Sequence, residues 1–275
     1  MNVIHVVPVF SKLNEEYIYL LIKYIEEVGV GLGVITGRLE NQSVRYVSNA
    51  KVIPGRESGK LTSIYLKLLS IVCNNYYEFE PVLLRHALLR FKPDIIHAHF
   101  GMSACGFATT TVPLLVSMHG HDGNVAIKNP KVKAAYLELV KNKLVHFTFP
   151  SNYFKYKFID SIGLPEYRGH VLKNPVNLTG FYRKETVSIN GASVNITCIG
   201  RFIPVKNQKI LVRLAAVLAN NGFCFNLNLI GFGPDEKVLR DLACELNVSA
   251  YVSFFVNPER REISKVLQGT DVYIQ

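Results

Sequence analysis

Two basic residues five positions apart, Arg201 and Lys206, are the part of this sequence best suited to hold an anion. They lie between a short β-branched run, residues 194–199, and a run with helical spacing of apolar residues, 208–218. The start of a helix offers free N–H groups and about half a positive charge. We therefore expect a phosphate or diphosphate to bind there. This motif alone leaves open a simple turn with two solvated charges.

A glycine-rich turn follows one strand and one helix further along the chain. Residues 223–230 alternate apolar and polar side chains like a strand, and residues 235–246 return to helical spacing. Between them, Gly231 and Gly233 would admit a backbone close to a ligand, where a Cβ atom would interfere. A basic turn followed by a glycine-rich turn indicates the carboxyl ends of neighbouring strands that face one nucleotide.

Histidine pairs end two further predicted strands in the amino-terminal half, at His97 and His99 and at His119 and His121. Ligands bind at such carboxyl ends in open α/β sheets. Alternate residues of a strand share a face and imidazole suits zinc or iron, so a metal-dependent hydrolase is an alternative. We expect His97 to be structural and His119, followed by Gly120, to be functional.

These segments resemble one enzyme family. The two loops are similar to the nucleotide-sugar half of retaining glycosyltransferases of family 4 (group 1), which have the GT-B fold. Residues 92–101 (KPDIIHAHFG) resemble its colanic-acid and exopolysaccharide subgroup. The resemblance implies that Arg201 and Lys206 neutralise the donor diphosphate, with Gly231 and Gly233 beside the nucleotide.

The resemblance also assigns residues of the amino-terminal half. A histidine matching His119 contacts the reacting sugar in that family, so His119 is the expected catalytic residue. Gly120, Asp122, His99 and Asn174 are expected to line the cleft. The nucleoside-diphosphate sugar is a substrate, and neither a cofactor nor a metal is expected.

The implied fold class is α/β, with two Rossmann-like doubly wound domains facing a cleft. We place an acceptor-side domain at residues 1–177 and a nucleotide-sugar-binding domain at 178–275, with polar, aperiodic residues 178–191 as a linker. The second sheet should have the order 3-2-1-4, with residues 271–275 starting its fourth strand. Family members continue with a Pro-Ser turn and two spaced glutamates, so we expect this domain to be incomplete and carboxy-terminally truncated.

Composition agrees with two packed domains, because 49% of the 275 residues are hydrophobic. Residues 1–177 hold 20 Lys and Arg against 13 Asp and Glu, a net charge of +7. That excess favours an anionic membrane face over nucleic acid, for which no motif is present. No secretion signal or bilayer-spanning run is visible, and five cysteines without C-x-x-C spacing indicate reduced thiols.

We therefore expect a cytoplasmic hexosyltransferase in peripheral contact with the inner face of the cell membrane. It would move a sugar, with retention, to a saccharide or lipid-linked saccharide acceptor during exopolysaccharide, capsule or lipopolysaccharide synthesis. A non-catalytic fragment that at most binds nucleotide is one alternative, and the metal-dependent hydrolase is the other.

Overall fold

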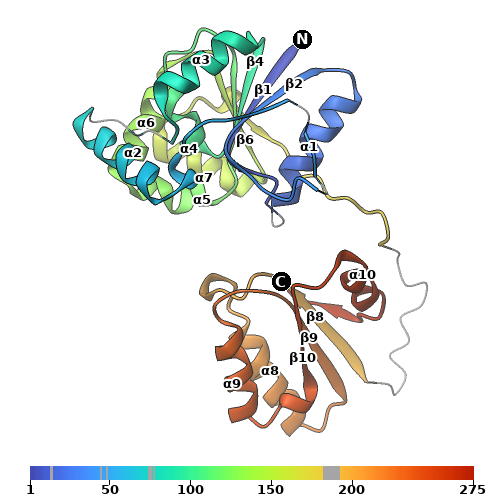
Figure 1. The fold of residues 1–275 in the computed structure, drawn as a ribbon. Helices are drawn as coiled ribbons and strands as arrows, with labels where there is room; N and C mark the ends of the chain where they lie inside the picture. Colours follow the sequence, from blue (N-terminus) through green and yellow to red (C-terminus); the bar gives the residue numbers. More distant parts are fainter. Residues whose placement is uncertain (13–14, 44, 48, 74–75, 77, 182–192) are drawn as a thin grey trace. The chain divides into compact units, whose positions relative to one another are not determined.

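In the computed structural model, the chain forms two compact units, Met1–Asn177 and Leu178–Gln275. The structure describes residues 1–12, 15–43, 45–47, 49–73, 76, 78–181 and 193–275. Most of the predicted linker therefore lies outside the described residues. Each unit is a parallel sheet with helices packed against it (Figure 1).

The amino-terminal unit contains a seven-stranded sheet of order β3-β2-β1-β4-β5-β6-β7. The central strands are mostly apolar because both faces of a parallel sheet are covered by helices, and the histidines of β1 and β4 are exceptions. In chain order the strands are β1 (Asn2–Phe10), β2 (Gly31–Leu39), β3 (Ala50–Val52), β4 (Ile95–His99), β5 (Leu114–Ser117), β6 (Val145–Phe149) and β7 (Gly169–Val171).

Local signals in the sequence explain where several helices of this unit start and end. Ser151 accepts a hydrogen bond from the Phe154 N–H and caps α7, which ends at Gly163 in the left-handed region, φ +66°. The helices are α1 (Glu16–Glu27), α2 (Lys60–Val72), α3 (Pro81–Phe91), α4 (Gly101–Ala104), α5 (His121–Asn124), α6 (Pro130–Lys141) and α7 (Asn152–Ile162).

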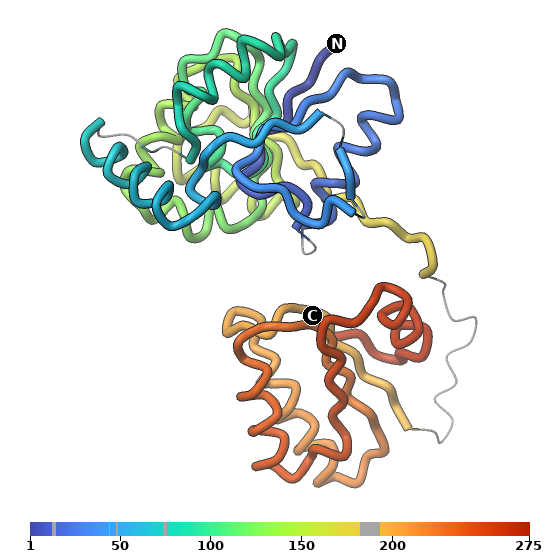
Figure 2. The backbone as a smooth tube through the Cα atoms, in the orientation of Figure 1, coloured from blue at the N-terminus to red at the C-terminus, as the bar shows by residue number. Residues whose placement is uncertain are grey.

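The carboxy-terminal unit has a four-stranded sheet of order β10-β9-β8-β11, which confirms the predicted order 3-2-1-4. Helix α9 begins at Glu236 with Asp235 at its N-cap, so Pro234 lies before the helix. The elements, traced in Figure 2, are β8 (Val194–Ile199), α8 (Lys209–Asn220), β9 (Phe225–Gly231), α9 (Glu236–Glu245), β10 (Val252–Val256), α10 (Arg260–Gln268) and β11 (Val272–Tyr273).

Each unit encloses its own apolar core. In the amino-terminal unit, Tyr136, Phe147 and Phe158 are fully buried between the sheet and its helices. In the carboxy-terminal unit, Phe202 and Leu229 are fully buried in the core. Among the described helices, none combines the length and apolar character required to cross a membrane.

Candidate functional site

Arg201 and Lys206 lie on the loop between β8 and α8. A 3-10 turn spans Pro204–Lys206 and α8 begins at Lys209, so both cations precede the helix. Both side chains are exposed, and neither forms an ion pair with any residue that the structure describes. Two unpaired cations near a helix start can bind an anion without first breaking an internal contact.

This loop is joined directly to the loop after β9. The N–H of buried Phe202 donates to the carbonyl of Phe232 at 2.7 Å, and the N–H of Asp235 donates to the carbonyl of Phe202 at 3.0 Å. In addition, Nε2 of buried Gln208 donates to the carbonyl of Arg201 at 2.9 Å. The two predicted ligand loops therefore form one fixed surface at the carboxyl ends of β8 and β9.

Gly231 and Gly233 make that junction possible. Their φ angles are +155° and +152°, values that favour glycine. A Cβ on Gly231 would collide with the carbonyl oxygen of Gly200, and one on Gly233 with the carbonyl oxygen of Phe202. The space next to these glycines is thus occupied by the loop between β8 and α8 of the same chain. Their place beside a nucleotide stays a prediction.

His97 and His99 of the amino-terminal unit are part of a buried cluster. His5 of β1 pairs in register with His97 of β4. Nδ1 of His5 lies 3.1 Å from Nε2 of His99, and Nε2 of His97 lies 2.7 Å from Oγ of Ser117. Burial, followed by the neighbouring histidines, lowers the pKa of His97 to about 3 and those of His5 and His99 well below their usual value. These rings are therefore neutral at pH 7.

His119 follows β5 and stacks on this cluster. Its ring lies 5.8 Å from that of His99, with 12° between the planes, and contacts the rings of Tyr17 and Phe100 at 4.9 and 4.8 Å. Burial lowers the pKa of His119 to about 4. Neither ring nitrogen has a hydrogen-bond partner within the described residues. A neutral imidazole with both nitrogens unused is suited to hydrogen-bond an uncharged ligand.

A small pocket brings three of the predicted residues together. His99 and His119 line it with Tyr17, and Asn174 borders it from the segment after β7. Its volume is about 140 Å³. Whole-ligand pockets usually measure about 300–1,000 Å³, so this one has room for only part of a sugar nucleotide.

Asp122 holds His119 in place through the backbone. It is fully buried, and its two carboxylate oxygens accept from the N–H of Gly101 and the N–H of His119, each at 2.8 Å. Burial raises the pKa of Asp122, while these backbone bonds lower it in part. Gly120, with φ +93°, turns the chain between His119 and the helix α5. Asp122 is therefore a positioning residue that ties the loop after β4 to the loop after β5.

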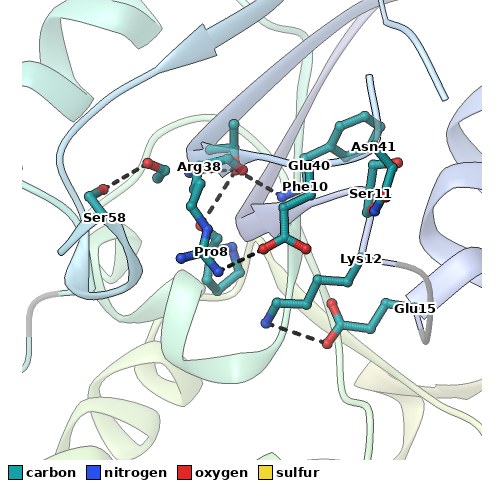
Figure 3. A network of polar contacts seen from close by, with 11 residues as sticks. Pro8, Phe10, Ser11, Lys12, Glu15, Arg38, Glu40, Asn41 and Ser58 are labelled. Atoms are coloured by element: carbon teal, nitrogen blue, oxygen red, sulfur yellow. Dashed lines mark hydrogen bonds and ion pairs between the residues drawn. The ribbon is translucent and has the colours of Figure 1, made fainter. Parts of the chain in front are cut away.

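The loop before Tyr17 is fastened to the end of β2 (Figure 3). Oγ1 of Thr36 accepts from the N–H of Phe10 at 3.1 Å, and Nδ2 of Asn41 donates to the carbonyl of Ser11 at 2.7 Å. Ser11 has φ +70°, a left-handed conformation that non-glycine residues adopt rarely. These bonds hold in place the chain segment that precedes Tyr17, a residue that lines the pocket.

Sequence reasoning missed His5. A lone histidine inside the apolar run VIHVV was the available signal, because a buried polar residue in a central strand needs a partner. His121 is exposed and lies outside the cluster. Within the described residues, His5, His97 and His99 offer nitrogen atoms within 4.8 Å of one another, a group that could hold a metal ion. No carboxylate belongs to this group.

Models of two protein families match the chain. Glycosyltransferase Family 4 matches residues 15–179, and Glycosyl transferases group 1 matches residues 183–275. No curated protein matches the sequence significantly.

Several solved structures have the same fold as this chain. The apo form of the lipopolysaccharide outer core galactosyltransferase WaaB is 13% identical, with a TM-score of 0.68 over 99% of this chain and 73% of that one. Anabaena HepE in complex with UDP and glucose is 14% identical, with a TM-score of 0.70 and the same coverage. Sucrose-phosphate synthase from Thermosynechococcus elongatus is 11% identical, with a TM-score of 0.68 over 99% of this chain and 74% of that one.

Two Rossmann-like units with this likeness define a GT-B glycosyltransferase fold, as predicted. The longer family match covers more than half of the sequence, and this chain therefore belongs to glycosyltransferase family 4. It is a transferase, so the metal-dependent hydrolase alternative is set aside.

Proposed function

We propose that this chain transfers a sugar from a nucleoside-diphosphate sugar to a saccharide or lipid-linked saccharide acceptor, with retention, in cell-surface polysaccharide synthesis. The observation that carries this proposal is the pair Arg201 and Lys206 on the joined β8 and β9 loops, two cations that form no ion pair with the described residues. The structures of HepE with UDP and glucose and of the lipopolysaccharide galactosyltransferase WaaB support the donor and the acceptor class.

In this reaction the bond between the anomeric carbon and the diphosphate oxygen breaks, and a bond to an acceptor hydroxyl oxygen forms. The hydroxyl proton leaves with the diphosphate. Arg201 and Lys206 stabilise the negative charge that develops on the leaving group, and removing one preorganised donor of this kind costs about 3 kcal/mol. His119, neutral and unpartnered, hydrogen-bonds the sugar.

We further propose that the donor is the only small molecule the reaction needs and that no metal takes part. The two cations would then supply the charge that a divalent ion supplies elsewhere. Elemental analysis of the purified protein checks this point, because one tightly held zinc or iron ion per chain would assign His5, His97 and His99 to a metal centre.

The amino-terminal unit would bind the acceptor at the cytoplasmic face of the membrane. Its net charge of +7 supports a peripheral contact with anionic lipid, where each basic residue near the surface contributes about 1 kcal/mol. In this proposal the contact is peripheral, which means that the surface of the amino-terminal unit touches the lipid.

The phosphate site is tested by a double substitution, Arg201→Ala with Lys206→Ala. We expect calorimetry with UDP, GDP and ADP to show at least about 100-fold weaker binding of whichever nucleotide the wild type prefers. A control with Arg213→Ala and Lys237→Ala removes the same charge from exposed positions on α8 and α9. Unchanged affinity in the first variant, with the far-UV circular dichroism of the wild type, would remove the phosphate site.

A further inference from the structure

Helix α2 is apolar on two opposite sides. Leu66 and Ser70 are buried against the unit, so one side is already used for packing. The other side exposes six large apolar side chains, which we call the α2 stripe. They are 48 to 84% exposed: Leu61, Ile64, Tyr65, Leu68, Ile71 and Val72.

The α2 stripe has the spacing of a continuous surface. Residues 61, 64, 65, 68 and 72 recur at intervals of three and four along the helix, which places them on one face. A surface helix normally carries polar residues on that side, and contiguous exposed apolar patches mark interaction sites. Figures 1 and 2 show α2 on the outside of the amino-terminal unit.

The charge around the α2 stripe favours an anionic partner. Lys60 and Lys67 lie seven residues apart along one edge of the stripe, and residues 60–72 contain no Asp or Glu. Long lysine side chains can leave their stems on apolar surface while their charge reaches lipid headgroups.

The position of α2 relates it to the pocket. It is inserted after β3, and the carboxyl ends of parallel strands meet at one edge of a sheet. His99 and His119 lie at that same edge. The chain therefore enters α2 from the same edge of the sheet that carries these two histidines.

We propose that α2 docks into the interface of an anionic bilayer, with its stripe at the acyl boundary and Lys60 and Lys67 among the headgroups. A second copy of the chain is a poorer fit, because a two-fold contact of α2 on α2 would gather like charges at its rim. The inference deepens the membrane part of the proposed function, and it does not depend on which sugar is transferred.

Flotation of the full chain with vesicles tests this surface. The wild type should float with phosphatidylcholine vesicles containing phosphatidylglycerol and stay behind with phosphatidylcholine alone. Leu61→Ser, Leu68→Ser and Val72→Ser combined should weaken binding about 100-fold or more. Lys60→Gln with Lys67→Gln should weaken it about 30-fold.

Matched controls lie on the same unit, away from α2. Tyr167→Ser removes a 72% exposed aromatic ring, and Lys141→Gln removes an exposed lysine. Both should float like the wild type. Vesicle binding retained by the triple variant would overturn the proposal, as would a wild-type dimer in light scattering that the triple variant abolishes.

Calorimetry with UDP separates the two proposals. The α2 variants should bind the nucleotide as the wild type does, because α2 and the Arg201 loop belong to different units. Loss of vesicle binding with intact nucleotide binding supports the α2 surface. Nucleotide binding without any vesicle binding by the wild type would overturn the α2 surface and leave the transferase proposal standing.

Discussion

The two units present opposite chemistry at the carboxyl ends of their strands. The amino-terminal unit offers neutral imidazoles that are buried against one another, and the carboxy-terminal unit offers exposed cations that form no ion pair with the residues the structure describes. Buried, uncharged hydrogen-bonding groups suit a sugar hydroxyl, whereas exposed guanidinium and ammonium groups suit a diphosphate. The difference predicts that the two sites fail in different ways when they are altered.

His119 should give the largest effect. His119→Ala should lower the rate of transfer from labelled sugar nucleotides about 10²- to 10⁴-fold, the usual range for a lost acid, base or hydrogen-bonding group. UDP affinity should be unchanged, because Arg201 and Lys206 lie on the other unit. His121→Ala, a change at the exposed histidine two residues on, should keep the rate of the wild type. Equal losses from both variants would assign the effect to the loop and not to the ring.

Gly233 tests whether the joined loops are structural. Gly233→Ala should lower the free energy of unfolding by about 3 kcal/mol, because its Cβ would meet the carbonyl of Phe202. Gly222→Ala is the control, since Gly222 also has positive φ, +75°, but faces open space. It should cost only about 1 kcal/mol. Similar losses in urea unfolding followed by circular dichroism would contradict the loop contact.

The smallest expected effect is the pH dependence of stability. The folded pKa values of His97 and His119, about 3 and about 4, lie below the unfolded value near 6.5. The unfolded chain therefore binds more protons below pH 6.5, and the stability present above that pH is lost as pH falls toward 4. Burial raises the pKa of Glu78 to about 7, which acts in the opposite direction between about pH 4.5 and 7.

Because the lowered pKa values of the four buried histidines outweigh the raised pKa values of Glu78 and Asp122, we expect a net loss of about 1–2 kcal/mol between pH 7 and pH 6. Denaturant unfolding at a series of pH values measures it. His97→Gln should reduce the dependence of the free energy of unfolding on pH. A stability that rises on acidification would show that the histidine cluster is not buried in its neutral form.

Parts of this comparison could be predicted from the sequence. The two loops, the sheet order of the second unit and the positions of His99 and His119 at strand ends follow from local spacing, because strands and helix starts are read within a few residues. The contact partners could not be predicted in this way. Gly231 and Gly233 approach the loop between β8 and α8. The carboxylate of Asp122 accepts a hydrogen bond from the N–H of Gly101, more than twenty positions away.

The sequence by itself determined the fold class, the family and the basic loop that carries Arg201 and Lys206, because apolar periodicity, glycines and paired cations are local properties of a chain. Only the tertiary structure decided that His5 joins His97 and His99 and that His121 does not. It also decided that α2 keeps one apolar side in solvent. The physical reason is that packing between segments far apart in the sequence decides which strands are neighbours and which helix faces are buried. The spacing of residues along the chain does not show which distant residue fills a given space.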